Sequence, residues 1–182
     1  QALPDGRVVV YTGDDANDEC VYKFIGSKAG SLSEGTLYVA NLSKGQWESL
    51  DYDSQPILQK HFKSQTEVLI RLRESSKLVG GTKLDRPEDI EIDPLTGAVF
   101  ISLSNNKPKG NYHGSILKIE ESNGQYDSLR FKPSRFLAGG EETGFSCPDN
   151  LAFDGAGNLW FTSDISGRSM NKGPYLSFKN NG

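Results

Sequence analysis

The sequence contains one motif twice, and an internal repeat restricts a chain to folds that stack copies of one small unit. The copies are Arg86-Pro87-Glu88-Asp89-Ile90 and Cys147-Pro148-Asp149-Asn150-Leu151. In each copy a carboxylate follows a proline, and a glycine with an apolar run comes next (Gly97 or Gly157). The second proline follows the first by 61 residues, which gives the approximate length of the repeated unit.

A second repeat supports the first. Gly35–Val39 is similar to Gly114–Lys118, and Gly45–Leu50 is similar to Gly124–Leu129, with an offset of 79 residues in both pairs. The two repeats together predict an architecture in which one supersecondary unit occurs several times.

The best-defined unit contains four predicted strands separated by turn signals, namely 88–93, 98–104, 114–120 and 125–131. Asp93–Gly97 predicts a turn between the first two strands, and Ser122-Asn123-Gly124 predicts a hairpin between the last two. Four antiparallel strands in meander order form one blade of a β-propeller.

The flanking sequence predicts incomplete blades. A second, a third and a fourth strand are expected at 6–12, 36–42 and 46–50, and a first and a second strand at 149–154 and 158–163. The expected fold is therefore all-β, a β-propeller fragment of about two and a half four-stranded antiparallel blades. Because propellers have about 4 to 8 blades, we expect the chain to be part of a longer polypeptide.

One helix is expected between two blades. Ser64–Glu67 has the form of a capping box, apolar residues follow at helical spacing, and Gly80-Gly81 predicts the C-terminal stop. The predicted organisation is a partial blade with an acidic metal loop, a helical insertion, a full blade, and a partial blade with a loop. These segments span 1–55, 56–81, 82–131 and 132–182.

Composition excludes some classes of function. The 182 residues carry a net charge of −4 and contain no apolar run long enough to cross a membrane,. This charge argues against nucleic acid and against an anionic membrane surface as partners. The two cysteines, Cys20 and Cys147, are compatible with a disulfide, with buried thiols or with metal ligands.

Carboxylates are expected where the innermost strands begin. Glu88 and Asp149 occupy that position in consecutive blades and would face the central channel, where converging oxygens suit Ca²⁺. The alternative is that both belong only to turns at strand starts. Cys20 directly follows the acidic segment Asp14–Glu19, and a thiolate at this position would favour a transition metal such as iron. The alternative is a solvated acidic loop beside a buried thiol.

Two further residues are candidates. Glu34 precedes a predicted strand at the position that His113 takes in the next blade, so the repeat itself does not require a carboxylate there. Arg86 adjoins Glu88, and its guanidinium could pair bidentately with phosphate. A surface ion pair of Arg86 with Asp85 or Asp89 is the alternative interpretation.

Five motifs, in this order, resemble the PhoX family of alkaline phosphatases over nearly the whole chain. They are Asp5–Asp15, Glu19–Phe24, Glu34–Ala40, Asp85–Glu91 and Cys147–Asp154. The resemblance implies a six-bladed β-propeller that is exported by the twin-arginine route to the periplasm or beyond. It also implies the hydrolysis of phosphomonoesters with calcium and iron ions (Ca²⁺ and Fe³⁺) as cofactors.

The resemblance further implies roles for single residues. Cys20 would be an iron ligand, Glu34 and Glu88 carboxylate ligands of the same cluster, Asp149 a further ligand, and Arg86 a phosphate contact. The implied partners are a small phosphomonoester substrate and the remaining blades, without nucleic acid or membrane. Since blades that carry ligands would be missing, we expect the chain alone to bind little iron and to lack phosphatase activity.

Two other functions fit the repeat. A calcium-dependent propeller hydrolase of lactonase type has a similar Pro-Glu-Asp motif, and a propeller can also be a non-catalytic binding module. Cys20 discriminates among the three functions, because neither alternative needs a thiol among its carboxylates.

Overall fold

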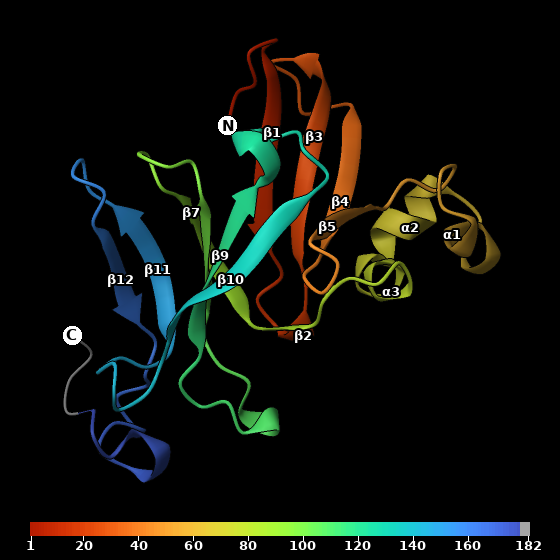
Figure 1. Cartoon of the computed structure of the whole chain (residues 1–182). Helices are drawn as coiled ribbons and strands as arrows, with labels where there is room; N and C mark the ends of the chain where they lie inside the picture. Colours follow the sequence, from red (N-terminus) through yellow and green to blue (C-terminus); the bar gives the residue numbers. More distant parts are fainter. Residues whose placement is uncertain (179–182) are drawn as a thin grey trace. The chain divides into compact units, whose positions relative to one another are not determined.

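The computed structural model describes residues 1–178, which fold into two compact units (Figure 1). The first unit consists of Gln1–Thr12, Cys20–Lys83 and Glu121–Lys132. The second consists of Gly13–Glu19, Leu84–Glu120 and the described residues from Pro133 to Phe178. The expected domain bounds stay a prediction, and residues 179–182 of the expected last segment lie outside the described residues.

The sheet of the first unit has four strands in the order β1-β3-β4-β5. Their bounds are β1 Arg7–Gly13, β3 Val21–Ala29, β4 Gly35–Asn41 and β5 Gln46–Ser49. The third and fourth strands lie where the sequence predicted them. The expectation that 6–12 is a second strand is wrong, because β3, which was not predicted, lies between β1 and β4.

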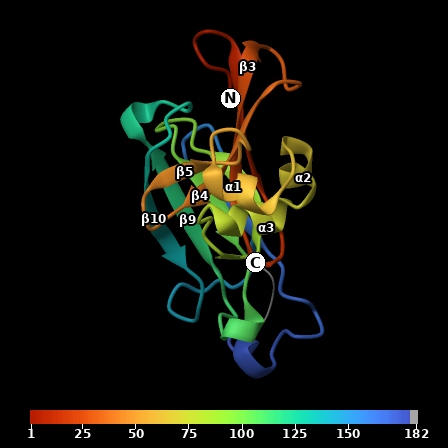
Figure 2. The ribbon, with the colours of Figure 1, turned by 90° about the vertical axis from the view of Figure 1, so that its right-hand side faces the viewer.

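Three short helices cover part of this sheet, where one helix was expected (Figure 2). They are α1 Pro56–His61, α2 Gln65–Ile70 and α3 Leu72–Leu78. The predicted cap is present, since the side chain of Ser64 accepts a hydrogen bond of 3.3 Å from the Glu67 N–H. The backbone leaves helical geometry at Arg71 (φ −101°, ψ 45°), which separates α2 from α3.

A buried ion pair lies within the first unit. Lys23 Nζ is 2.8 Å from Glu121 Oε1, and both side chains are almost completely buried. The carboxylate also accepts hydrogen bonds from Tyr11 Oη at 2.6 Å and from Trp47 Nε1 at 3.1 Å. Lys23 additionally donates to the carbonyl oxygen of Ser128 at 2.6 Å, so the charged groups of this pair are well supplied with partners.

The second unit is built around a sheet in the order β10-β9-β8-β7 and a two-stranded sheet β11-β12. The bounds are β7 Pro87–Ile92, β8 Val99–Leu103, β9 Ser115–Glu121, β10 Phe131–Ala138, β11 Pro148–Phe153 and β12 Leu159–Ser163. A short ladder pairs β2 Asn17–Glu19 with β6 Leu84–Asp85. Two four-stranded sheets and one half-sheet confirm the predicted fragment of about two and a half blades.

One predicted strand is wrong. The segment 125–131 follows a 3₁₀ turn at Ser122–Gly124 and forms a loop, and the fourth strand of this sheet begins only at Phe131. The loop bonds instead to β5 in the first unit, where the Trp47 N–H donates to the Leu129 carbonyl at 3.0 Å. The segment 125–131 is therefore similar to β5 in sequence, but it does not pair with the third strand of its own sheet as β5 does.

The proline motif is repeated in the hydrogen bonds as well as in the sequence. The N–H of Asp89 in β7 bonds to Ser102 Oγ in β8 at 2.9 Å. At the matching place, the N–H of Asn150 in β11 bonds to Thr162 Oγ1 in β12 at 3.1 Å. The two copies are thus the same structural unit.

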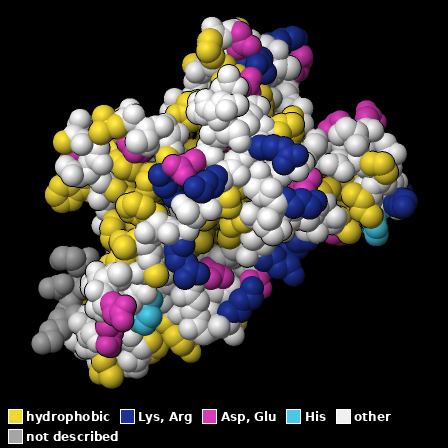
Figure 3. Space-filling model, viewed as in Figure 1, with side chains coloured by type: hydrophobic (Ala, Val, Ile, Leu, Met, Phe, Trp, Pro, Cys, Tyr) yellow, Lys and Arg dark blue, Asp and Glu magenta, His cyan; other side chains and the backbone are white. Residues whose placement is uncertain are grey.

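None of the helices among residues 1–178 has the length and apolar character needed to cross a bilayer. On the face shown in Figure 3, basic and acidic side chains are interspersed. No broad basic region is visible on that face.

Candidate active site

Both proline motifs begin with an uncommon backbone conformation. Arg86 has φ 59° and Cys147 has φ 51°, and each directly precedes the proline that starts β7 or β11. A non-glycine residue in the left-handed region costs energy, and a following proline restricts it further. Such conformations persist only where the surrounding structure enforces them, and they concentrate at functional sites. Glu88 and Asp149 each lie two residues after one of these strained residues.

The guanidinium of Arg86 lies among carboxylates of the second unit. Its Nε is 2.9 Å from Asp15 Oδ1 and its Nη2 is 3.0 Å from Asp15 Oδ2, a bidentate pair. Nη2 is also 3.4 Å from Glu88 Oε1, and Nη1 is 3.7 Å from Asp164 Oδ2. Asp15 therefore fixes one edge of the guanidinium, while the contact of Nη1 with Asp164 is longer than a hydrogen bond.

The carboxyl groups that head β7 and β11 are held in a region unfavourable to negative charge. Burial raises the pKa of Glu88, and the charges of Asp15 and Asp149 add to this effect, although Ser104 and Arg86 oppose it. Burial also raises the pKa of Asp149, as do the charges of Asp164 and Asp89. A cluster with more carboxylates than positive side chains, each disfavouring ionisation of the next, is a favourable environment for a bound cation.

Replacing Asp149 with asparagine should stabilise the chain at pH 7. The folded state raises the pKa of Asp149, so the ionised carboxylate is less favourable in the folded state than in the unfolded state. The free energy of unfolding therefore falls as the pH rises and Asp149 ionises. We expect Asp149→Asn to raise Tm by roughly 1–3 °C at pH 7, a shift that corresponds to a small free-energy change in a chain of this size. Near pH 3, where the aspartate is protonated, the two proteins should unfold at the same temperature.

Asp154→Asn is the matched control, because Asp154 lies at the end of the same motif with the opposite shift. Hydrogen bonds from Asn158 and Trp160 lower the pKa of Asp154, so its ionised form stabilises the fold above its ordinary pKa,. This variant should lower Tm at pH 7. Thermal unfolding by circular dichroism at both pH values measures the two effects, and a lower Tm for Asp149→Asn at pH 7 would contradict the electrostatic argument.

The residues that directly follow β8 and β12 also lie near the carboxylates around Arg86. Ser104 follows β8, and Asp164 takes the matching place after β12. The N–H of Ser104 bonds to the Arg86 carbonyl at 3.2 Å, and the N–H of Asp164 bonds to the Cys147 carbonyl at 2.8 Å. These two positions therefore adjoin the two strained residues in the same way.

The other two predicted ligands belong to the first unit. Cys20 is completely buried in an apolar cluster with Tyr22, Val39 and Leu50. Glu34 is more than half exposed and pairs with Lys28 at 2.7 Å. The four predicted ligands are thus divided between the two units, with Glu88 and Asp149 in the second, and a shared cluster of all four stays a prediction.

Two members of the cluster around Arg86, Asp15 and Asp164, were not among the predicted site residues. Asp15 stood within the acidic segment that was considered only for Cys20, and Asp164 lies just outside the second predicted strand of its blade. The signal for Asp164 was the repeat itself, because its position matches that of Ser104 with an offset of 60 residues.

The donor chemistry of the second unit fits a hard cation such as Ca²⁺. The groups near Arg86 are carboxylate oxygens, which are the ligands that Ca²⁺ prefers. Among residues 1–178, however, no three His, Cys, Asp or Glu side chains gather closely enough to hold a metal ion by themselves. The described residues thus offer part of an oxygen-rich site, and Arg86 contributes the positive charge within it.

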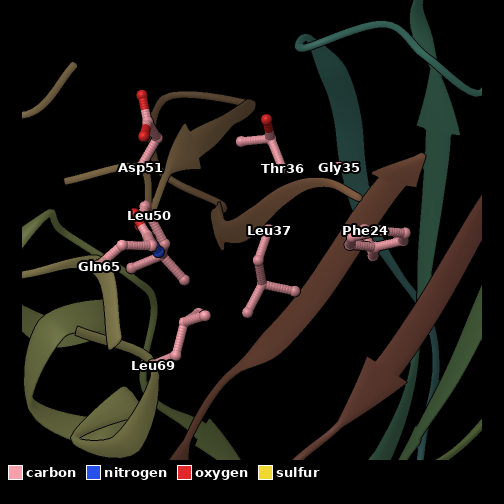
Figure 4. A pocket seen from close by; sticks show the side chains of 8 residues that line it. All are labelled: Phe24, Gly35, Thr36, Leu37, Leu50, Asp51, Gln65 and Leu69. Carbon is pink, nitrogen blue, oxygen red and sulfur yellow. The ribbon is translucent and has the colours of Figure 1, made fainter. Parts of the chain in front are cut away.

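The first unit contains a separate pocket of about 310 Å³ beside β4 and α2 (Figure 4). Leu37, Leu50 and Leu69 line it together with the side chain of Gln65. The Gln65 amide accepts a hydrogen bond from the Tyr52 N–H at 2.7 Å and donates one to the Leu50 carbonyl at 3.1 Å. This amide therefore joins the helix to the sheet.

Comparison with known proteins places the chain in a family. Residues 2–182 match the sequence model described as "Alkaline phosphatase PhoX". No curated protein matches the chain significantly. Among solved structures, Pseudomonas fluorescens PhoX in complex with vanadate, a transition state analogue, has a TM-score of 0.90 and 30% identity. The similarity covers 100% of this chain and 40% of the Pseudomonas chain. The chain belongs to the PhoX alkaline phosphatase family.

Proposed function

We propose that the chain is part of a metal-dependent phosphatase that hydrolyses small phosphomonoesters. The observation that supports this most directly is the placement of Arg86 among the carboxylates of Asp15, Glu88 and Asp164, in a chain of the PhoX family. Vanadate binding by the Pseudomonas relative, described there as a transition state analogue, agrees with phosphoryl chemistry. Because the chain spans 40% of that relative, the activity is proposed for the whole protein that contains it.

Arg86 would orient the substrate. Asp15 pairs with one edge of its guanidinium and fixes the plane of the group. The Nη1 edge, with its long contact to Asp164, could then donate to an oxygen of the phosphate,. Asp15 therefore orients the Arg86 guanidinium toward the substrate.

Glu88 and Asp149 would hold the cofactor. Their raised pKa values follow from burial and from neighbouring carboxylates, and a bound cation would remove that electrostatic penalty,. Calcium and iron, when bound, supply Lewis acidity and neutralise charge that develops on the phosphoryl oxygens. Cys20 and Glu34 are proposed as the remaining ligands from this chain, with Cys20 as the thiolate for iron.

We also propose that the whole protein is exported to the periplasm or beyond and releases phosphate there for uptake. This proposal rests on the family to which the chain belongs.

The test is hydrolysis of p-nitrophenyl phosphate by the whole protein, together with analysis of its bound metals. Activity with both iron and calcium bound would support the proposal. Calcium alone, without phosphatase activity, would point to a hydrolase of lactonase type. A protein without metal and without activity would be a binding module.

Arg86→Met in the whole protein should lower kcat/KM for p-nitrophenyl phosphate by at least about tenfold, the effect of losing one charge-assisted contact in the transition state. The bound calcium and iron should change little, because arginine is no metal ligand. The chain of 182 residues alone should bind little iron and show no activity. Rapid hydrolysis by the chain alone would contradict the need for further blades.

A further inference from the structure

We propose that Ser104 is a positioning residue that ties the Glu88 carboxylate to the start of β11, so that Glu88 and Asp149 face the same cation. This inference rests on the proposed role of the two carboxylates as ligands. It assigns to Ser104 a function that its place beyond the end of β8 would not by itself suggest.

The geometry around the Ser104 hydroxyl carries the inference. The residue is completely buried, and its Oγ is in direct hydrogen-bonding contact with Glu88 Oε2. The same Oγ lies 2.9 Å from the carbonyl oxygen of Pro148, the residue directly before Asp149. One hydroxyl therefore lies within hydrogen-bonding reach of a side chain of β7 and of the backbone of β11, and its single hydrogen is shared between these two acceptors,.

The bond to Glu88 is the stronger of the two contacts. A serine hydroxyl has one hydrogen, and a hydrogen bond to an ionised carboxylate is roughly twice as strong as one to a neutral carbonyl. Arg86 contacts the other oxygen of this carboxylate, Glu88 Oε1, at 3.4 Å. Without Ser104, the carboxylate would be free to turn toward Arg86.

The repeat explains why this position can fulfil the role. In both copies, the residue after the second strand has its N–H bonded to the strained residue before the proline. In the first copy that residue is Ser104, which contacts the carboxylate of its own motif, and in the second copy it is Asp164, which contacts Arg86. The fold thus places a short polar side chain at the same point twice.

Ser104→Ala tests the inference in the whole protein after removal of its bound calcium, because the other blades are proposed to supply the remaining ligands. Loss of a residue that orients a metal ligand typically lowers metal affinity about 10–100-fold. We expect that loss in a titration with Ca²⁺ followed by the side-chain carboxyl NMR signals of Glu88 and Asp149. Without Ca²⁺, the Glu88 carboxyl signal should shift and its side chain should become less ordered.

Ser102→Ala is the matched control. Ser102 is equally buried two residues earlier, and its hydroxyl bonds to the backbone of Asp89 instead of a carboxylate. This variant should leave the Ca²⁺ affinity and the Glu88 signals unchanged, while thermal unfolding shows whether both variants fold.

Two failures can be told apart. If Glu88 and Asp149 in the whole wild-type protein do not respond to Ca²⁺, the proposed role of the carboxylates fails. The order of Glu88 without Ca²⁺ still decides the role of Ser104. If Glu88 is equally ordered in Ser104→Ala and in the wild type, or if Ser102→Ala disturbs it as much, Ser104 is not a positioning residue.

Discussion

Replacing Lys23 with methionine should lower the free energy of unfolding by about 3–5 kcal/mol, because the substitution leaves the Glu121 carboxylate buried without its cation. The lysine and the glutamate are 2.8 Å apart and nearly inaccessible to solvent. Burial lowers the pKa of Lys23 and raises that of Glu121, and their mutual attraction opposes both shifts. Either group alone would therefore be strongly disfavoured in its charged form.

The pH dependence of Lys23→Met follows from the same shifts. Without the lysine, the pKa of Glu121 rises further in the folded state, so this variant loses stability as the pH rises and regains part of it in acid. Urea denaturation at pH 7 and at pH 5 measures this difference. A penalty that did not shrink at pH 5 would contradict the interpretation of an unpaired buried carboxylate.

A double variant separates charge from packing. Lys23→Met with Glu121→Gln removes both charges and keeps an amide oxygen that can accept from Tyr11 and Trp47, so it should be more stable than Lys23→Met alone. Lys28→Met is the control for losing a lysine, because the pair of Lys28 with Glu34 is exposed. Its effect should stay below about 1 kcal/mol.

This ion pair also shows why one strand could not be predicted. β3 contains Lys23 at a completely buried position, and the partner that permits its burial lies 98 residues away. A buried charge is acceptable only with such a partner, and local patterns contain no information about it. The strand was therefore missed, although the strands on either side of it were expected.

The local part of the site was predictable and the long-range part was not. The proline motif specifies where β7 and β11 begin, and hence where Glu88 and Asp149 stand, because proline and the residue before it restrict the backbone directly. The pairing of Arg86 with Asp15 spans 71 residues and depends on how the second unit folds. The sequence therefore predicted the carboxylates at the strand heads but not the arrangement around Arg86.

Gly114→Ala should lower the free energy of unfolding by about 2–5 kcal/mol. Gly114 has φ 70°, which costs an alanine about 1–2 kcal/mol,. A Cβ atom there would also lie 2.1 Å from the Leu103 carbonyl oxygen and 2.2 Å from that of Ser104. Moving backbone to relieve such an overlap costs about a further 1–3 kcal/mol.

Glycine is thus required at this position of the repeat because the backbone of the neighbouring strand lies too close for a Cβ atom. Gly35, which matches Gly114 in the other copy, would place a Cβ 2.4 Å from the Ile25 carbonyl oxygen. In both sheets the third strand starts against the backbone of the second strand, and only glycine fits there. The repeated glycine was visible in the sequence, but its reason is visible only in the structure.

Gly110→Ala is the control that lacks the steric overlap with neighbouring backbone. Gly110 has a similar φ of 79°, but a Cβ there would meet no atom within 4 Å. This variant should cost only the conformational part, about 1–2 kcal/mol. Urea denaturation of the two variants gives the difference, and equal losses would show that φ alone explains the glycine. Because the overlap in Gly114→Ala falls on the Ser104 carbonyl, that variant should also disturb the Glu88 signals, whereas Gly110→Ala should leave them unchanged.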